Sequence, residues 1–391
     1  MPSLKSVADQ AGATLLATYH ALSHARLVDP SLGDLVRRAA IEQGYTLRIT
    51  IRDVAALAGV SVSTVSYVIN ANPLVNVDTR RKVEAAIEAL EYRPNSTARN
   101  LKASETRMIG YAWHRVYDVV QRNQVLDRFL YEMAQAAERK GYHVLTFAPS
   151  APHAEEGYTN LIRTNRVDGF VVSDTTYDDP RIRRLQELHV PFACFGRSNA
   201  AWDFPYADDD GPRGVGLVVQ HLLAQGHTHI AMLGWPEGAV VGDLRVHGFH
   251  EALQAAGLNI HPGSLVRTLN DVPHAAKAAE HVLSLSPSPT AIICATDIIA
   301  IGVRMYLERS GLRMGADVAV ASYDDTPVAE ALGLTSVHQH IEVIARAVTD
   351  LLIGEIQGTP ALERHVLVEP SLIVRASSGV GSQMPFWQPE G

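Results

Sequence analysis

The chain lacks the features of secreted, membrane-spanning and disulfide-linked proteins. Its 391 residues include two cysteines, Cys194 and Cys294, and both lie within apolar runs, so we expect buried, reduced thiols rather than a disulfide. No stretch reaches the roughly 18 unbroken apolar residues that a membrane span needs, and residues 1–12 have no basic-then-apolar signal pattern. These absences predict a cytoplasmic protein that has no membrane partner.

The sequence also lacks the motifs of common enzyme classes. It has no phosphate-binding Walker loop, no Gly-x-Ser-x-Gly motif and no His-Glu-x-x-His motif. Residues 226–229 and 338–340 are rich in histidine, but neither stretch has a cysteine or carboxylate partner at ligand spacing. The acidic run 208–211 lacks the downstream ligands of a calcium loop and is expected to cap a helix. We therefore expect no enzyme activity, no catalytic residues, no cofactor and no metal.

Charge is distributed unevenly along the chain. The net charge is −8, yet residues 1–107 hold 13 Lys and Arg against 10 Asp and Glu, a formal charge of +3, and the remainder carries −11. Phosphate contacts need local rather than global positive charge. This distribution fits a protein that touches DNA at one end only, and an unevenly charged solvated surface is the alternative.

The most specific pattern lies in residues 49–101. Its first apolar stretch, at helical spacing, ends at Gly59, and Ser61 is placed to cap a second helix. That second helix leaves four side chains outward: Val62, Ser63, Thr64 and Tyr67. Two short helices joined by a glycine turn indicate a helix-turn-helix, whose second helix reads the major groove of double-stranded DNA. Asp78 or Thr79 is expected to cap a third helix.

Two motifs in this region identify a family resemblance. Gly-Val-Ser-x-x-Thr-Val-Ser spans residues 59–66, and Tyr-x-Pro-Asn-x-x-Ala-Arg-x-Leu spans residues 92–101. Either motif alone is weak, whereas both at this spacing are specific. From about residue 50 to residue 378 the chain resembles the lactose-repressor (LacI/GalR) family of bacterial transcription regulators. The resemblance implies a homodimer on a palindromic DNA operator, whose affinity a small-molecule effector controls.

The resemblance also implies roles for individual residues of the DNA-binding head. It implies phosphate contacts from Ser61, Thr64 and Asn70 and contacts with base edges from Val62, Ser63 and Tyr67. Tyr67 stands where relatives commonly carry Arg, so the operator is expected to differ at that base step. Residues 95–106 are expected to form a hinge helix on the operator, in which Asn95 and Ala98 make contacts and Leu101 wedges a minor-groove step. An ordinary interdomain linker is the alternative.

The first 48 residues repeat the head at a constant offset of 47. Nine of the 42 positions from Leu4 to Tyr45 are identical to the residue 47 positions later, without a gap, and they include core and turn positions such as Val7 and Gly12. We interpret residues 1–48 as a degenerate duplicate helix-turn-helix. The outward residues of the second copy are replaced by Leu15, Leu16, Ala17 and His20. The duplicate is therefore expected to serve in packing or interaction, with independent DNA contact as the alternative.

From residue 107 onward, seven short apolar runs alternate with helical patterns. They are residues 109–112, 144–147, 169–172, 192–195, 230–233, 291–294 and 318–321. Continuous apolar strands separated by helices are typical of parallel sheets covered on both faces. We expect all-α helix-turn-helix heads followed by an α/β body of two doubly wound parallel-sheet lobes, which the family resemblance makes similar to periplasmic sugar-binding proteins.

Polar residues gather after these strands, at the edge where ligands of doubly wound sheets bind. The expected effector contacts are His114, Arg197, Trp235, Arg245, Asp297, Asp324 and Gln339, of which the last four match the family's effector positions. Carboxylates and arginine bind paired hydroxyls, and a tryptophan face packs on a pyranose, so the set favours a carbohydrate. For each residue alone, a strand-end cap or a salt bridge between lobes is the alternative.

The prediction is thus a homodimeric regulator, most simply a repressor. Its segments are residues 1–48, 49–94, 95–106, 107–378 and a flexible tail, 379–391. The tail has no heptad run, which argues against a coiled-coil tetramer. Two alternatives remain: a cytoplasmic sugar-binding protein with a vestigial DNA head, and a regulator that uses a purine corepressor. Aromatic stacking on both faces of the ligand would favour the purine.

Overall fold

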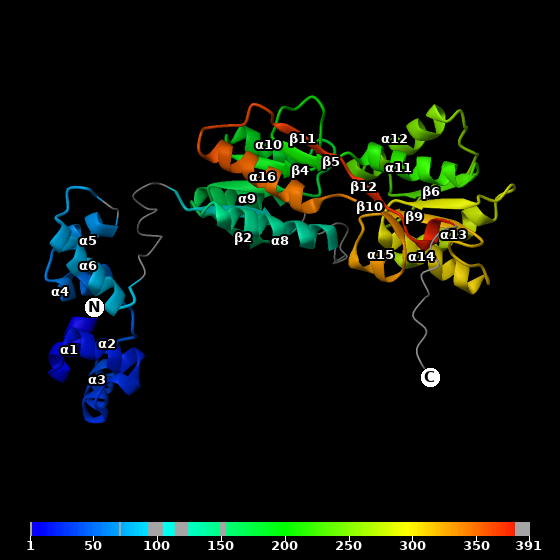
Figure 1. Ribbon diagram of the computed structural model, residues 1–391. Coiled ribbons are helices and arrows are strands. Elements are labelled where there is room, and N and C mark those ends of the chain that lie inside the picture. The colour runs from blue at the N-terminus through cyan, green and yellow to red at the C-terminus, as the bar shows by residue number, and fades with distance from the viewer. Residues whose placement is uncertain (1, 70–71, 93–104, 114–123, 149–153, 380–391) are drawn as a thin grey trace, which may run out of the picture. The chain divides into compact units, whose positions relative to one another are not determined.

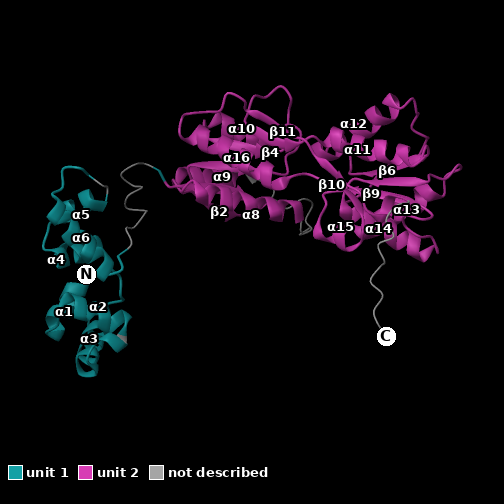
Figure 2. Cartoon of the chain, in the orientation of Figure 1, with its two compact units in different colours: residues 1–105 teal, residues 106–391 magenta. Residues whose placement is uncertain are grey.

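The computed structural model describes residues 2–69, 72–92, 105–113, 124–148 and 154–379. The chain divides into two compact units, residues 1–105 and residues 106–391 (Figure 2). Five predicted contact residues lie outside the described residues: Asn70, Asn95, Ala98, Leu101 and His114. Residues 95–104 of the predicted hinge and 380–391 of the predicted tail lie outside them as well.

The described part of unit 1 contains two three-helix repeats (Figure 1). The first repeat consists of α1 (Leu4–Ala11), α2 (Leu15–Ser23), a 3₁₀ turn (Ala25–Leu27) and α3 (Pro30–Glu42). The second repeat consists of α4 (Ile51–Ala58), α5 (Val62–Ile69) and α6 (Val77–Ala89). Each α-helix of the second repeat begins 47 residues after its counterpart in the first, so the offset in the sequence is also the offset of the helices.

The same local interactions begin and end the helices of both repeats. Gly12 and Gly59 follow the first helix of each repeat with φ angles of 64° and 67°, a left-handed conformation that favours glycine. Thr14 and Ser61 cap the next helix, since each hydroxyl oxygen accepts a hydrogen bond from the backbone N–H three residues later, at 3.2 and 3.1 Å. The predicted glycine turn and Ser61 cap are confirmed.

The third helix of the second repeat begins earlier than predicted. Asn76 caps α6, rather than Asp78 or Thr79, because Asn76 Oδ1 accepts a hydrogen bond from the Asp78 N–H at 2.8 Å. Asp78 instead lies in the first turn of the helix, where its negative charge faces the positive end of the helix dipole. In the first repeat, Asp29 occupies the matching N-cap of α3.

The first lobe of unit 2 is built on a six-stranded parallel sheet. Its strand order is β11-β5-β4-β3-β1-β2, and every neighbouring pair is parallel. The strands are β1 (Met108–Ala112), β2 (His143–Phe147), β3 (Gly169–Val172), β4 (Phe192–Phe195), β5 (Tyr206–Asp209) and β11 (His365–Val368). Successive side chains of β3 pack on opposite faces, against α8 (Gln124–Arg139) and α16 (Ile341–Ile356) on one side and α9 (Ala154–Arg163) and α10 (Pro180–Glu187) on the other.

The second lobe repeats this architecture with an antiparallel edge. Its strand order is β12-β10-β9-β8-β6-β7, in which the β12–β10 pair is antiparallel and the others are parallel. The strands are β6 (Ile230–Gly234), β7 (Leu265–Arg267), β8 (Ala291–Cys294), β9 (Ala319–Tyr323), β10 (Thr335–His338) and β12 (Ser371–Ile373). The covering helices are α11 (Gly211–Ala224) with α12 (Val240–Ala255), and α13 (Val272–Leu283) with α14 (Asp297–Arg309) (Figure 1).

The predicted two-lobed α/β body is confirmed, and all seven predicted strands are present. Five strands are additional: β5, β7, β10, β11 and β12. Strands β7 and β12 have only three residues each, and β5 contains Asp208 and Asp209, so none of these three strands shows a continuous apolar run. Only Asp210 of the predicted helix cap at 208–211 performs that role, because its side chain accepts from the Arg213 N–H at 3.1 Å. Both cysteines are buried and free, as predicted.

The chain passes between the lobes at three places in the described part of unit 2. The crossings are β5 to α11, β10 to α16, and β11 to β12. The short helix α15 (Pro327–Ala331) follows β9, and a 3₁₀ turn (Ala376–Ser378) follows β12. Side chains next to a crossing therefore lie close to both lobes.

None of the described helices is by itself long and apolar enough to cross a membrane. One bent pair, α4 with α5, meets the length and composition test when its two helices are taken together.

Candidate functional site

Helix α5 presents a row of polar and apolar side chains on its outer side. Val65 and Val68 are buried within unit 1, which turns the opposite face of the helix outward. That face carries Ser61, Ser63, Val62 at 42% exposure and Tyr67 at 52% exposure. Thr64 is half-buried, and its hydroxyl lies 2.8 Å from that of Ser61. The helix thus offers hydroxyl groups that can bind phosphates and base edges.

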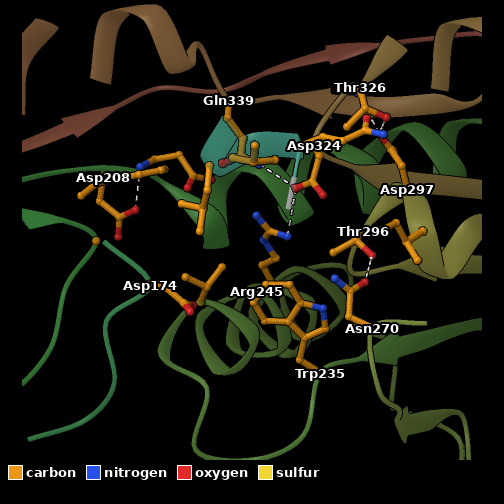
Figure 3. A pocket seen from close by; sticks show the side chains of 18 of the residues that line it. Asp174, Asp208, Trp235, Arg245, Asn270, Thr296, Asp297, Asp324, Thr326 and Gln339 are labelled. Atoms are coloured by element: carbon orange, nitrogen blue, oxygen red, sulfur yellow. Dashed lines mark hydrogen bonds and ion pairs between the residues drawn. The ribbon is translucent and has the colours of Figure 1, made fainter. Parts of the chain in front are cut away.

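A second candidate site is a cavity between the two lobes of unit 2, where strands of both sheets end (Figure 3). The first lobe contributes Asp174, Thr175, Gly196, Asp208 and Asp209. The second lobe contributes Trp235, Asn270, Thr296, Asp324 and Gln339, which follow β6, β7, β8, β9 and β10 in turn. Arg245 of α12 also lines it. This is the place at which doubly wound sheets bind ligands.

Most of the predicted effector residues meet in this cavity. Five of the seven line it: Trp235, Arg245, Asp297, Asp324 and Gln339. Arg197 stands behind the wall, because its Nε donates to Asp208 Oδ2 at 2.8 Å and its Nη2 donates to the Asp209 carbonyl at 3.2 Å. His114 lies outside the described residues.

Arg245 occupies the middle of the cavity (Figure 3). It is 2% exposed, and its guanidinium carbon lies 3.6 Å from the centre of the Tyr323 ring and 5.8 Å from that of Trp235. Its Nη1 donates to the Ala295 carbonyl at 2.5 Å. Among the described residues, its Nε has no hydrogen-bond partner, and the buried indole N–H of Trp235 has none either. Both are thus buried donors on residues that line the cavity.

Asp324 contacts two other side chains of the cavity, Arg245 and Gln339. Its Oδ1 accepts a hydrogen bond from Gln339 Nε2 at 2.7 Å and lies 3.4 Å from Arg245 Nη1 (Figure 3). Burial raises the pKa of the Asp324 carboxyl, and the Arg245 charge opposes that rise. The carboxylate therefore orients an arginine and an amide that come from different elements.

Asp297 lines the cavity as expected, and its carboxylate also accepts four hydrogen bonds from the protein. Its Oδ1 accepts from the hydroxyls of Ser322 and Ser336 at 2.6 and 2.8 Å, and its Oδ2 accepts from the Thr326 N–H and hydroxyl, both at 2.8 Å. A carboxylate has about four acceptor positions, and the protein uses four. Asp297 therefore joins the ends of three segments at the cavity wall rather than offering a free acceptor.

The first-lobe wall carries a pair of buried carboxylates. Burial and the Asp209 charge raise the pKa of Asp208 to about 7, although Arg197 lowers it. Asp209 Oδ2 accepts a hydrogen bond from the Tyr323 hydroxyl at 2.5 Å. Because Asp209 ends β5 and Tyr323 ends β9, this bond joins the two lobes beside the cavity.

The expected effector contacts leave out three residues that line the cavity: Asp174, Asp208 and Asn270. Asp174 follows a strand that the sequence predicts, and this position was a usable signal; its carboxylate accepts no hydrogen bond from the described residues, and burial raises its pKa. Asn270 follows the three-residue strand β7, which has no recognisable pattern, and its Oδ1 accepts from Thr296 Oγ1 at 2.6 Å. Asp208 lies inside a strand that a charged sequence conceals.

Comparison with protein families matches both parts of the chain. The family described as bacterial regulatory proteins, lacI family, matches residues 50–95. A periplasmic binding protein-like domain matches residues 219–378. The HTH-type transcriptional repressor PurR of Escherichia coli O1:K1 / APEC is 30% identical over 341 residues, which cover 85% of this chain and 97% of that protein.

Solved structures show the same similarity. A complex of the transcriptional regulator CelR with cellobiose is 29% identical, covers 85% of this chain and 100% of that one, and has a TM-score of 0.65. The lac repressor dimer bound to operator and the anti-inducer ONPF is 27% identical, covers 85% and 99%, and has a TM-score of 0.74. Head and body thus match known regulators in the same order and over nearly their full length. The chain belongs to the lacI family of bacterial regulatory proteins and is a DNA-binding transcriptional regulator under ligand control.

Proposed function

We propose that the chain is a cytoplasmic, homodimeric repressor, that it binds a palindromic operator, and that a carbohydrate in the cavity between its lobes controls its affinity for that operator. The observation that carries the carbohydrate assignment is the cavity wall, which combines unpartnered donors and acceptors with one available aromatic face among the described residues. A related regulator has been solved with cellobiose, which supports a sugar as the class of ligand.

The polar groups of the wall suit hydroxyls. Arg245 Nε and the Trp235 indole are donors, the Asp174 carboxylate is an acceptor, and Gln339 can do both. A neutral polyol can satisfy all of them without bringing a charge into a buried site, where an unpaired charge is costly. Vicinal hydroxyls also match the paired atoms of a carboxylate or guanidinium.

The aromatic groups argue against a stacked purine, the alternative ligand. Two aromatic side chains line the cavity in the described residues, Trp235 and Phe195. Phe195 is 8% exposed and stacks on Phe129, with ring centres 4.6 Å apart, so it is engaged in the core of the first lobe. One exposed aromatic face suits the apolar side of a pyranose, whereas a base held from both sides needs two.

On the DNA side, α5 is proposed as the reading helix. Its outward residues Val62, Ser63 and Tyr67 are assigned to base edges, and Ser61 and Thr64 to phosphates. By family likeness, Asn70 contacts phosphate and the hinge residues Asn95, Ala98 and Leu101 contact the operator centre or the partner hinge. The exposure of the α5 face supports a working head over a vestigial one.

Calorimetric titration of the full chain tests the ligand assignment, with a panel of mono- and disaccharides beside nucleobases and nucleosides. We expect a saccharide to bind, and Gln339→Ala to weaken it by about tenfold or more, because the variant removes a direct contact and the partner of Asp324. Gln254→Ala, at an exposed position of α12, is the matched control. Binding of nucleobases without saccharides would support the purine alternative.

Selection from random DNA duplexes at fixed salt tests the operator assignment. Enrichment of a palindrome supports the proposed homodimer on two half-sites. If no DNA sequence is enriched while a saccharide still binds, the result would support the alternative, a sugar-binding protein whose DNA head is vestigial.

A further inference from the structure

Three side chains of the types that can bind metals lie close together outside the cavity, at the crossing from β10 to α16. They are His338, His340 and Glu342, and their ligand atoms lie within 4.8 Å of one another. We expected residues 338–340 to have no carboxylate at ligand spacing, and this expectation is wrong. The first turn of α16 brings Glu342 Oε1 to 3.7 Å from His340 Nδ1.

Each of the three side chains is held from behind by another residue. Asp325 Oδ2 lies 2.9 Å from His338 Nδ1, and the Ser371 hydroxyl lies 3.1 Å from His340 Nε2. Arg128 Nη2 donates to Glu342 Oε2 at 3.1 Å. These contacts use one nitrogen of each imidazole ring and one oxygen of the carboxylate. The other atom of each group, His338 Nε2, His340 Nδ1 or Glu342 Oε1, takes no part in them. Outer partners that fix the second ring nitrogen are what metal-binding histidines normally have.

The backbone at His340 also favours this arrangement. His340 has φ 53° and ψ 49°, the left-handed region that is uncommon for residues other than glycine, although asparagine, aspartate and histidine enter it more often than the rest. It stands at the N-cap of α16, yet its side chain makes no capping hydrogen bond. The conformation instead brings its ring to 4.7 Å from the His338 ring, edge to face at 84°. Unusual backbone geometry of this kind collects at functional sites.

We propose that His338, His340 and Glu342 bind one divalent transition-metal ion of the zinc class. Two neutral imidazoles and one carboxylate, with a water molecule completing the shell, are a ligand set that Zn²⁺ accepts and Mg²⁺ does not prefer. The side chains are 20%, 34% and 33% exposed, so an ion can enter from solvent.

The surrounding charges are compatible with a cation. Arg128 contacts Glu342, and Arg375 Nη1 lies 2.8 Å from Asp325 Oδ1. Both arginines are thus already paired with carboxylates. The two arginines and the two carboxylates cancel, so the cluster is formally neutral before the metal binds.

The position of the site gives the metal a role in lobe movement. His338 and His340 flank Gln339, which lines the effector cavity, and they lie on one of the three crossings between lobes. A bound ion joins the end of β10 in the second lobe to the first turn of α16 in the first. It therefore stiffens this crossing and changes effector affinity by a coupling that acts equally in both directions. This coupling rests on the proposed function, whereas metal binding does not.

Titration of the chelator-treated full chain with Zn²⁺, followed by calorimetry and by the visible absorption of Co²⁺ in its place, tests the site. We expect one ion per chain, a cobalt spectrum typical of imidazole and carboxylate ligands, and at least tenfold weaker binding in His340→Asn and in Glu342→Gln. Asparagine tolerates the left-handed backbone, so His340→Asn removes the imidazole without straining the crossing. Glu342→Gln keeps the size of the side chain.

The matched control is His247→Asn, which breaks a histidine and glutamate pair elsewhere, His247 with Glu251 on α12, whose side chains are exposed. The proposal would be overturned if His247→Asn lowered zinc binding as much as His340→Asn does. It would also be overturned if none of the variants changed zinc binding. An absence of Zn²⁺ binding, in a chain whose circular dichroism shows it folded, would overturn it as well. If the metal bound but did not change effector affinity, the metal site would be supported and only its proposed regulatory role would be ruled out.

Discussion

The two repeats of unit 1 have the same fold, but their second helices face different surroundings. In α5, Val62, Ser63 and Tyr67 are exposed; in α2, the counterpart helix, no side chain is exposed. Leu15, Leu16 and Tyr19 of α2 pack in the same apolar cluster as the core of the second repeat. A helix-turn-helix is therefore not by itself a DNA reader, because the residues at the outward positions decide whether the helix binds DNA or protein.

Polar contacts accompany this packing. His24 Nε2 lies 3.0 Å from Glu91 Oε1, beyond the end of α6. Burial raises the pKa of Tyr19, and the Glu91 charge adds to the rise. The sequence predicts packing or interaction for the first repeat, with DNA contact as the alternative, and these contacts favour packing.

The largest effect is expected from Tyr19→Ala. Tyr19 is 4% exposed in the cluster shared by the two repeats, and removal of a buried aromatic ring costs about 3 kcal/mol. Hydrogen exchange in α4 of the second repeat should then speed up by about a hundredfold, as measured by mass spectrometry. Leu35→Ala, at a position that is 53% exposed on α3, is the control and should leave α4 unchanged. Equal exchange in both variants would mean that α2 does not brace the second repeat.

The next largest effect is expected on operator affinity, and it distinguishes α5 from α2, its counterpart in the first repeat. Tyr67→Ala should weaken binding to the selected operator by about 2 kcal/mol, or about thirtyfold, because it removes a side chain that we propose contacts a base edge. His20→Ala, at the equivalent position of α2, should leave operator affinity and the selected sequence unchanged. Fluorescence anisotropy at fixed salt measures both. A sequence preference that changes in His20→Ala would show that the first repeat also reads DNA.

The sequence predicts those parts of the fold that depend on interactions between residues close together in the chain. Gly59 and Ser61 form the turn because their conformation and cap are local, and seven buried strands are visible as apolar runs. Packing or interaction is the expected role of the first repeat, but Leu15 and Leu16 also suit thymine methyls, so the sequence does not exclude DNA contact. Only the tertiary arrangement shows which they meet.

The same distinction applies to the cavity and the crossing. Arg245, Asp324 and Gln339 were found because they follow family positions. The four hydrogen bonds of Asp297 and the convergence of Glu342 on His340 depend on which segments meet in space. A single sequence does not contain that information.

A smaller effect should be the same in both repeats. Gly12→Ala and Gly59→Ala each place a Cβ in open space, with no atom within 4 Å, so their cost is that of the left-handed backbone alone, about 1 kcal/mol. Hydrogen exchange should speed up about fivefold in the helix before each glycine. A clear difference between the two variants would mean that the repeats differ in stability as well as in surroundings.

The smallest effect is expected from Glu91→Gln. The side chains of His24 and Glu91 are 44% and 67% exposed, and exposed ion pairs contribute less than about 1 kcal/mol because water and salt screen them. Exchange in α4 should change little at low salt and not at all at high salt. If Glu91→Gln opened α4 as much as Tyr19→Ala, charge rather than apolar burial would hold the repeats together. DNA phosphates would then compete for His24, and the first repeat would be released on the operator instead of remaining docked.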